Sequence, residues 1–178
     1  MPDSGITRIL ITEDEIKATV ERLGAEITAC YMGIAGERVV IGLLRGSFVF
    51  MADLIRQIKL PLVVDFMAVS TYGDGTVSSG DVKVAMDLDE SIENRDVLLV
   101  EDIVDTGNTF NKIIRMMHNR NPRSLRICTF LDKPSRRIAH VDIDFCGITI
   151  PDEFVCGYGL DFAQRYRNLP YVGVLQVE

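Results

Sequence analysis

The sequence predicts an α/β fold with a central, mostly parallel, twisted sheet that is flanked by helices. Short apolar runs alternate along the chain with segments of helical periodicity, as they do in βαβ units. Residues 39–44 form a continuous apolar run, which is typical of a parallel strand covered on both faces. Residues 97–102 form an apolar strand that ends in two acids, and ligands of such sheets bind at the carboxyl ends of the strands.

The composition indicates a soluble globular protein, and we expect residues 1–178 to form one domain. The formal net charge of −7 argues against a broad nucleic-acid surface. No apolar stretch approaches the ~20 residues that cross a bilayer, and the N-terminus lacks the basic and apolar pattern of a signal peptide. We therefore expect a cytoplasmic protein that binds neither nucleic acid nor a membrane.

The cysteines and histidines argue against a metal centre built from these residue types. No C-x-x-C pair is present, so we expect reduced, buried thiols at Cys30, Cys128, Cys146 and Cys156. The two histidines, His118 and His140, stand far from any second ligand of this kind in the sequence, which argues against a zinc site.

The first half of the chain predicts two helices and two strands. Thr12 and Glu15 form a capping box, and Ile16, Val20, Leu23 and Ile27 follow at helical spacing. The strand at 39–44 ends at the turn 45–47, and a helix is expected over 48–58. A long strand is expected over 62–71.

The second half begins with a polar, glycine-rich loop at 72–81. A returning strand is expected at 82–86, then a strand at 97–101, a helix at 108–118 and a strand at 125–130. Shorter strands are expected near Phe145, Val155 and Val172.

The run 97–109 carries the clearest chemical signal. Glu101 and Asp102 end the apolar strand, Asp105 follows, and the run holds no Lys or Arg. Acids that repel one another in this way are seldom kept for stability. Glu101 and Asp102, expected on opposite faces of the strand, can accept hydrogen bonds from sugar hydroxyls. Residues 106–109 supply N–H groups at a helix N-terminus for a phosphate, so the run indicates a ribose 5-phosphate site.

Two other interpretations of the acids are open. They could be a solvent-facing strand end. They could also hold magnesium in a nucleotide hydrolase, but such an enzyme needs a G-x-x-x-x-G-K-[ST] loop, which the sequence lacks.

The acidic run closely resembles the ribose-phosphate signature of type I phosphoribosyltransferases. The resemblance covers nearly the whole chain, through segments 43–48, 70–73, 131–137, 154–161 and 165–167. Within the family it points to the branch that acts on hypoxanthine and guanine. It implies the type I phosphoribosyltransferase fold, with a small hood formed by the chain ends and a flexible loop. It also implies transfer of a 6-oxopurine onto 5-phosphoribosyl 1-diphosphate (PRPP), which yields IMP or GMP and pyrophosphate.

The resemblance implies a role for each motif residue. Ribose and phosphate would be bound by Glu101, Asp102, Ile103, Val104, Asp105, Thr106, Gly107, Asn108 and Thr109, with Asp105 as the catalytic base on purine N7. Pyrophosphate would be bound by Leu44, Arg45, Gly46 and Arg167, with a cis peptide bond before Arg45. The purine would be bound by Lys133, Phe154, Val155 and Asp161.

The resemblance further implies Mg²⁺ as cofactor, with Glu101, Asp102 and Asp161 as its ligands. A flexible lid at 72–81 would be anchored by Ser70, Thr71, Tyr72 and Gly73. Relatives of this kind are homodimers or homotetramers, and we expect one of these states.

Plainer interpretations of the motif residues are also open. Arg45 and Gly46 could form a simple turn, Lys133 could be a hydrated loop lysine, and Phe154 and Val155 could be a core strand. Loop 72–81 could be an ordinary hairpin tip. An RNA-binding regulator on the same fold would need a basic patch, against which the net charge argues. A nucleotide binder without transfer activity would not need the complete acid and lysine set.

Overall fold

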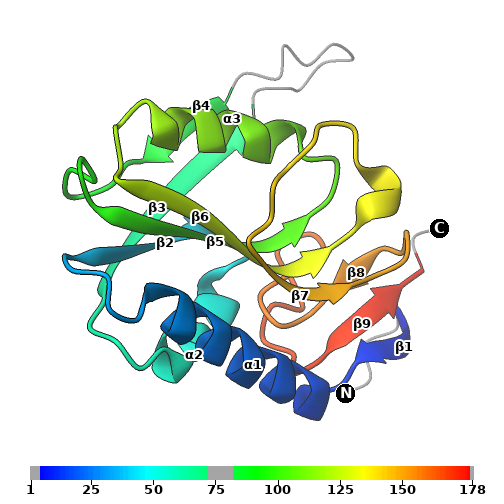
Figure 1. Ribbon diagram of the computed structural model, residues 1–178. Coiled ribbons are helices and arrows are strands. Elements are labelled where there is room, and N and C mark those ends of the chain that lie inside the picture. The colour runs from blue at the N-terminus through cyan, green and yellow to red at the C-terminus, as the bar shows by residue number, and fades with distance from the viewer. Residues whose placement is uncertain (1–4, 72–81, 177–178) are drawn as a thin grey trace.

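The computed structural model describes residues 5–71 and 82–176, and a six-stranded sheet lies at its centre (Figure 1). The strand order is β4-β3-β2-β5-β6-β7. Neighbouring strands are parallel, except that β4 runs antiparallel to β3. The mostly parallel sheet that the sequence predicts is therefore confirmed. The strands are β2 (Arg38–Leu44), β3 (Val63–Thr71), β4 (Val82–Met86), β5 (Asp96–Val104), β6 (Ser124–Asp132) and β7 (Phe145–Thr149).

Helices cover both faces of this sheet. Figure 1 shows α1 (Glu13–Tyr31) and α2 (Phe48–Gln57) on one side and α3 (Asn108–His118) on the other. Consecutive residues of β2 enter different cores: Val40 packs into the core below α1 and α2, whereas Ile41 packs into the core below α3. Burial on both faces explains why these strands read as continuous apolar runs rather than alternating ones.

The two chain ends form a second, smaller sheet. Its antiparallel order is β1-β9-β8, with β1 (Ile6–Ile11), β9 (Val172–Leu175) and β8 (Val155–Cys156). This is the hood of chain ends that the resemblance implies. Strand β1 was not predicted, because half of its residues are exposed and its apolar pattern is weak. It is a strand because residues at the opposite end of the chain pair with it.

Most predicted elements are present, with small shifts at their ends. The capping box is confirmed: the Glu15 N–H donates to Thr12 Oγ1 at 3.3 Å, and the Thr12 N–H donates to Glu15 Oε2 at 2.8 Å. The prediction that the acidic strand ends at residue 101 was wrong. Pairing with β6 continues through Ile103 and Val104, so the first two acids lie inside the strand. The sequence does not indicate this extension of the strand, because acidic residues are uncommon in β-strands.

Among the residues that the structure describes, none of the helices has the length and hydropathy of a membrane span. None of the four cysteines forms a disulfide bond, as expected. Cys128 and Cys156 are buried, whereas Cys30 and Cys146 are only partly buried. Burial raises the pKa of the Cys128 thiol, which keeps it uncharged.

Candidate active site

A cleft of about 230 Å³ opens at the carboxyl ends of β2 and β5, beside the start of α3. It gathers most of the residues predicted to bind the sugar phosphate. The predicted residues that line it are Leu44, Gly46, Glu101, Asp102, Ile103, Val104, Asp105, Thr106, Gly107 and Thr109. Apolar side chains from the sheet and α3 complete it: Leu43, Val69, Phe110 and Ile113.

Two carboxyl groups meet in this cleft. We expected Glu101 and Asp102 on opposite faces, but both line the cleft and their carboxyl groups are hydrogen-bonded. Strand alternation fixes only the Cα–Cβ direction, and the longer Glu101 side chain can turn its carboxyl group toward Asp102. Burial, followed by the neighbouring acid, raises the pKa of Glu101 well above its usual value. Burial also raises the pKa of Asp102.

The protein itself supplies few hydrogen-bond partners for these two carboxyl groups. Glu101 Oε2 is buried and has no hydrogen-bond partner in the described part of the chain. Asp102 accepts a hydrogen bond from the Ile103 N–H at 3.0 Å. A Cβ atom on Gly46 would lie 1.6 Å from Asp102 Oδ2, so only glycine lets the turn after β2 come this close. The pocket therefore presents carboxyl oxygens that a bound ligand or cation would satisfy.

Asp105 lies at the other edge of the cleft, after the end of β5. Its Oδ1 is buried without a hydrogen bond among the described residues, and Arg136 Nε lies 3.5 Å from that atom. The acid is therefore paired with a cation that the run 97–109 does not contain. Arg137 donates to the main-chain oxygens of Asp105 and Val104 at 3.0 and 3.2 Å, and it also bonds the Asp132 carboxylate. It thus fixes the backbone that carries the acid.

The phosphate cradle was predicted at the turn before α3, which includes a glycine with a positive φ. Gly107 has φ +81°, and an added Cβ atom there would lie 2.4 Å from the Ala139 oxygen. The Thr106 oxygen accepts from the Ile138 and Ala139 N–H groups at 2.9 and 3.0 Å, which fixes this turn against residues 138–139. The first N–H groups of a helix have no partner within the helix, so they are available to an anion. Asn108 is exposed and is not among the residues that line the cleft.

The predicted pyrophosphate residues form a second group beside the cleft. The Leu44–Arg45 peptide bond is cis, as the resemblance implies. Arg167 forms an ion pair with Asp161 at 2.7 Å and donates to the Gly159 oxygen at 2.7 Å. A Cβ atom on Gly159 would lie 2.2 Å from the Gly46 oxygen, so the C-terminal segment packs directly on the turn after β2.

The predicted purine residues form a third group. Lys133 is buried, with 5% of its surface exposed, and its Nζ donates to the Glu153 oxygen at 2.8 Å. Phe154 is 44% exposed and contacts Phe162 edge-to-face at 5.6 Å between centroids. Val155 is buried in β8. Asp152 lies between this group and the cleft, since it is 3.9 Å from Lys133 Nζ and 3.8 Å from Arg136 Nε.

The predicted metal ligands and the predicted lid residues agree with the structure only in part. The described residues contain no group of three or more His, Cys, Asp or Glu that could hold a metal, so Asp161 does not cluster with Glu101 and Asp102. Ser70 and Thr71 end β3, next to the start of the predicted lid. Tyr72, Gly73 and the rest of loop 72–81 lie outside the described residues.

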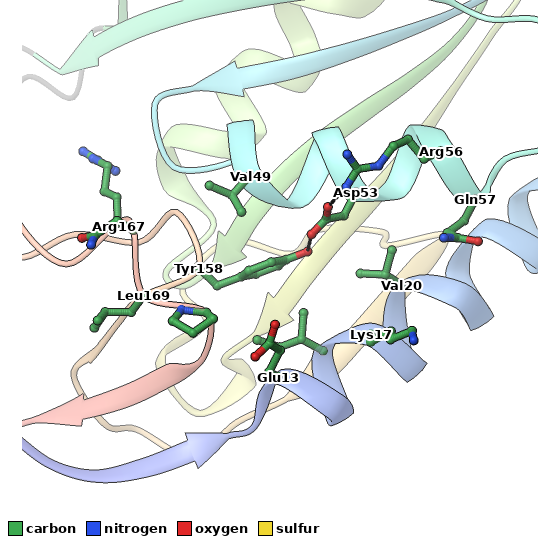
Figure 2. Close-up of a pocket in the computed structure, with 13 residues that line it drawn as sticks. Glu13, Lys17, Val20, Val49, Asp53, Arg56, Gln57, Tyr158, Arg167 and Leu169 are labelled. Carbon is green, nitrogen blue, oxygen red and sulfur yellow. Dashed lines mark hydrogen bonds and ion pairs between the residues drawn. The ribbon is translucent and has the colours of Figure 1, made fainter.

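A larger cavity of about 470 Å³ lies elsewhere, between α1, α2 and residues 158–170 (Figure 2). Two of its polar side chains share one carboxylate: Tyr158 donates to Asp53 Oδ2 at 2.7 Å, and Arg56 bonds the same carboxylate. Nothing that lines it is a buried polar atom without a partner. The smaller cleft is therefore the better candidate, because unsatisfied groups mark a binding site more clearly than volume does.

Three residues that touch the predicted site had no predicted role. Arg136 and Arg137 were quoted within a motif without a function, although two adjacent basic residues close to Lys133 are a visible signal. Gln164 had no such signal. Its side-chain oxygen accepts hydrogen bonds from both Arg45 and Arg167, and no sequence pattern indicates that contact.

Comparisons with known proteins show what the chain is similar to. A family model described as the phosphoribosyl transferase domain matches residues 12–163. The chain is 56% identical over 165 residues to a hypoxanthine phosphoribosyltransferase of Salmonella typhimurium, with 93% of each chain covered. It is 51% identical over 171 residues to a hypoxanthine-guanine phosphoribosyltransferase of Bacillus subtilis, covering 96% of this chain and 94% of that one. A solved hypoxanthine phosphoribosyltransferase from Staphylococcus aureus has a TM-score of 0.92 at 46% identity, covering 99% and 97%.

Proposed function

Because this chain belongs to the phosphoribosyl transferase family, we propose that the cleft at the end of β5 binds the ribose 5-phosphate part of PRPP. The protein is a purine-salvage transferase that converts hypoxanthine to IMP. We further infer that guanine is a second substrate and yields GMP. One observation supports this site assignment. Buried carboxyl oxygens without hydrogen-bond partners and the N-terminus of α3 lie at the same cleft.

We propose that Asp105 is the general base of the reaction. It takes the proton from purine N7 as N9 attacks the anomeric carbon, and the C1 bond to pyrophosphate breaks. The transition state resembles an oxocarbenium ion, as at other glycosidic bonds. Arg136 next to the acid and Arg137 behind its backbone support this proposal, because both hold Asp105 in a fixed place.

We propose that Lys133 selects the purine base by a hydrogen bond. Its ammonium group can only donate, so it bonds a 6-oxo group and offers nothing to a 6-amino group. The exposed ring of Phe154 provides a stacking surface, with Val155 behind it. Arg45, Arg167 and the backbone at Leu44 and Gly46 would stabilise the charge of the departing pyrophosphate.

We infer that a pair of carboxylates suffices to hold a magnesium ion in this cleft, although the described residues contain no group of three such ligands. Mg²⁺ is usually held by one or two carboxylates together with substrate oxygens, and Glu101 has a buried carboxyl oxygen without a partner. We propose that Glu101 and Asp102 hold the ion and that Asp161 reaches it through water, since its carboxylate already accepts from Arg167 and the Gln164 N–H. When bound, the ion neutralises charge on pyrophosphate.

Incubation with PRPP, Mg²⁺ and each free purine in turn tests the function. We expect IMP from hypoxanthine and GMP from guanine, and no AMP from adenine. The Asp105→Asn variant should lower kcat/KM for hypoxanthine by about 10²–10⁴-fold, the usual contribution of a general base. Asp142→Asn is the matched control, because the Asp142 side chain is 95% exposed and outside the cleft. A loss of less than about tenfold in Asp105→Asn would remove the base from this residue.

A cytoplasmic location and a homodimeric or homotetrameric state stay predictions of the same proposal. Size-exclusion chromatography with light scattering would give the oligomeric state directly.

A further inference from the structure

Gln164 joins the two arginines that we assign to pyrophosphate. Its Oε1 accepts a hydrogen bond from Arg45 Nη1 at 3.2 Å and another from Arg167 Nη2 at 3.3 Å. Arg45 follows β2, whereas the other two residues lie in the segment before β9, so the contact spans 119 residues of sequence. One side-chain oxygen therefore brings two distant parts of the site together.

The arrangement places two positive charges on one neutral acceptor. A guanidinium group only donates, and an amide oxygen has two lone pairs, so the oxygen of Gln164 can serve both arginines. Arg167 also has the carboxylate of Asp161 as a partner. Arg45 forms no ion pair with any residue in 5–71 or 82–176. The three residues therefore hold an excess of positive charge at one point, which attracts a multiply charged anion.

The backbone holds Gln164 in this position. Its φ is +65°, in the left-handed region that residues other than glycine rarely adopt. The Gln164 N–H donates to Asp161 Oδ2 at 2.8 Å, and Phe162 and Arg165 pair across the same turn. A residue kept in a sparsely populated conformation by its neighbours is frequently part of a ligand-binding site.

We propose that Gln164 is a positioning residue that sets the spacing of Arg45 and Arg167 for the diphosphate of PRPP. This inference rests on the proposed function of the site. Gln164 itself need not touch the substrate, because its amide oxygen orients the two groups that do. A neutral amide suits this role, whereas a carboxylate at the same place would neutralise the arginines and repel the anion.

The test compares Gln164→Ala and Gln164→Glu with Arg165→Ala. Arg165 is the exposed neighbour in the same turn, and its change alters the local charge without touching either hydrogen bond. We expect Gln164→Ala to raise KM for PRPP about tenfold, with kcat and KM for hypoxanthine within about twofold. Gln164→Glu should raise KM for PRPP further. Arg165→Ala should resemble the unmodified protein in all three constants.

Titration calorimetry with pyrophosphate gives a second measurement that needs no turnover. The unmodified protein should bind pyrophosphate about tenfold more tightly than Gln164→Ala. Equal pyrophosphate affinities or equal KM values for PRPP would overturn the inference, and so would a parallel change in all the kinetic constants. Failure of the proposed function gives a different result, because the unmodified protein would then form no IMP at all.

Discussion

Lys133 shows how the fold changes the chemistry of a single side chain. A lysine beside a proline in a loop is usually hydrated, yet here 5% of its surface is exposed. Its Nζ donates to the Glu153 oxygen and faces Asp152. The ammonium group is therefore fixed in direction by the protein itself, as the proposed recognition of a 6-oxo group would require.

Replacement of Lys133 by methionine tests this role at the residue scale. Lys133→Met keeps the apolar stem and removes the donor, so kcat/KM for hypoxanthine should fall about 10- to 100-fold, as expected for a hydrogen bond to a charged group. Steady-state kinetics would measure the change, with circular dichroism to check folding. Lys59→Met, at an exposed lysine, should leave kcat/KM unchanged. Equal values for both variants would contradict base recognition by Lys133.

The candidate site could be predicted from the sequence only where its residues are contiguous. The acids and the helix start lie within one run of the chain, so Glu101, Asp102 and Asp105 were identified together. Their partners were not, because Arg136 comes from a later turn that the fold brings to 3.5 Å from Asp105. The absence of basic residues inside the run suggested three unpaired acids, and the tertiary structure supplies a cation to one of them.

At the scale of elements, an ion pair joins the beginnings of β5 and β6. Asp96 is buried, with 3% of its surface exposed, and accepts from Arg123 Nε at 3.0 Å and Ser124 Oγ at 2.8 Å. The hydrogen bond from Arg123 is the main reason why the pKa of Asp96 is lowered. A lowered pKa in the folded state means that this carboxylate stabilises the fold above its unfolded pKa of about 3.9.

Removal of Arg123 should therefore have a pH-dependent effect. Arg123→Ala should lower the free energy of unfolding by about 1–3 kcal/mol at pH 7, because a buried carboxylate loses its donor. The difference from the unmodified protein should shrink as the pH falls below about 4 and toward the lowered pKa of Asp96, at which the folded protein also binds the proton. Urea unfolding at several pH values would measure it.

Arg56→Ala is the control for this prediction, since its ion pair with Asp53 is exposed and should contribute less than about 1 kcal/mol. A difference between Arg123→Ala and the unmodified protein that stays constant from pH 7 to pH 3 would contradict the assignment to Asp96.

Elements with strong local patterns were predicted well, and elements defined by distant partners were not. Helix α1 has both a capping box and regular apolar spacing, so its start at Glu13 follows from local residues. Strand β1 has only β9 to define it, and the sequence positions that pair are more than 160 residues apart. The extension of β5 past Glu101 likewise depends on its partner β6.

At the scale of the whole molecule, contacts among three aromatic rings connect the six-stranded sheet to the segment between β8 and β9. Phe130 of β6 lies 5.2 Å from Phe50 of α2 and 5.0 Å from Tyr158, measured between ring centroids. Tyr158 donates in turn to Asp53 of α2, as Figure 2 shows. Phe130 is almost fully buried at this junction, so it supports the sheet, a helix and the C-terminal segment together.

Truncation of Phe130 tests this arrangement. Phe130→Ala should lower the free energy of unfolding by about 3–5 kcal/mol, because it removes a buried ring and leaves a cavity. Chemical denaturation would measure the loss. Phe48→Ala is the matched control, since Phe48 is 45% exposed, and it should cost less than about 1 kcal/mol. Similar losses in both variants would show that the junction is not a centre of stability.

The α/β class, the order of most elements and the acidic motif could be predicted from local patterns, because periodicity and contiguous motifs are local properties of the chain. Packing in three dimensions was needed to show which distant side chains meet: Arg136 at Asp105, Gln164 between two arginines, and Lys133 buried against Glu153. Such contacts depend on how strands and turns pack in three dimensions, and spacing along the chain carries little information about them.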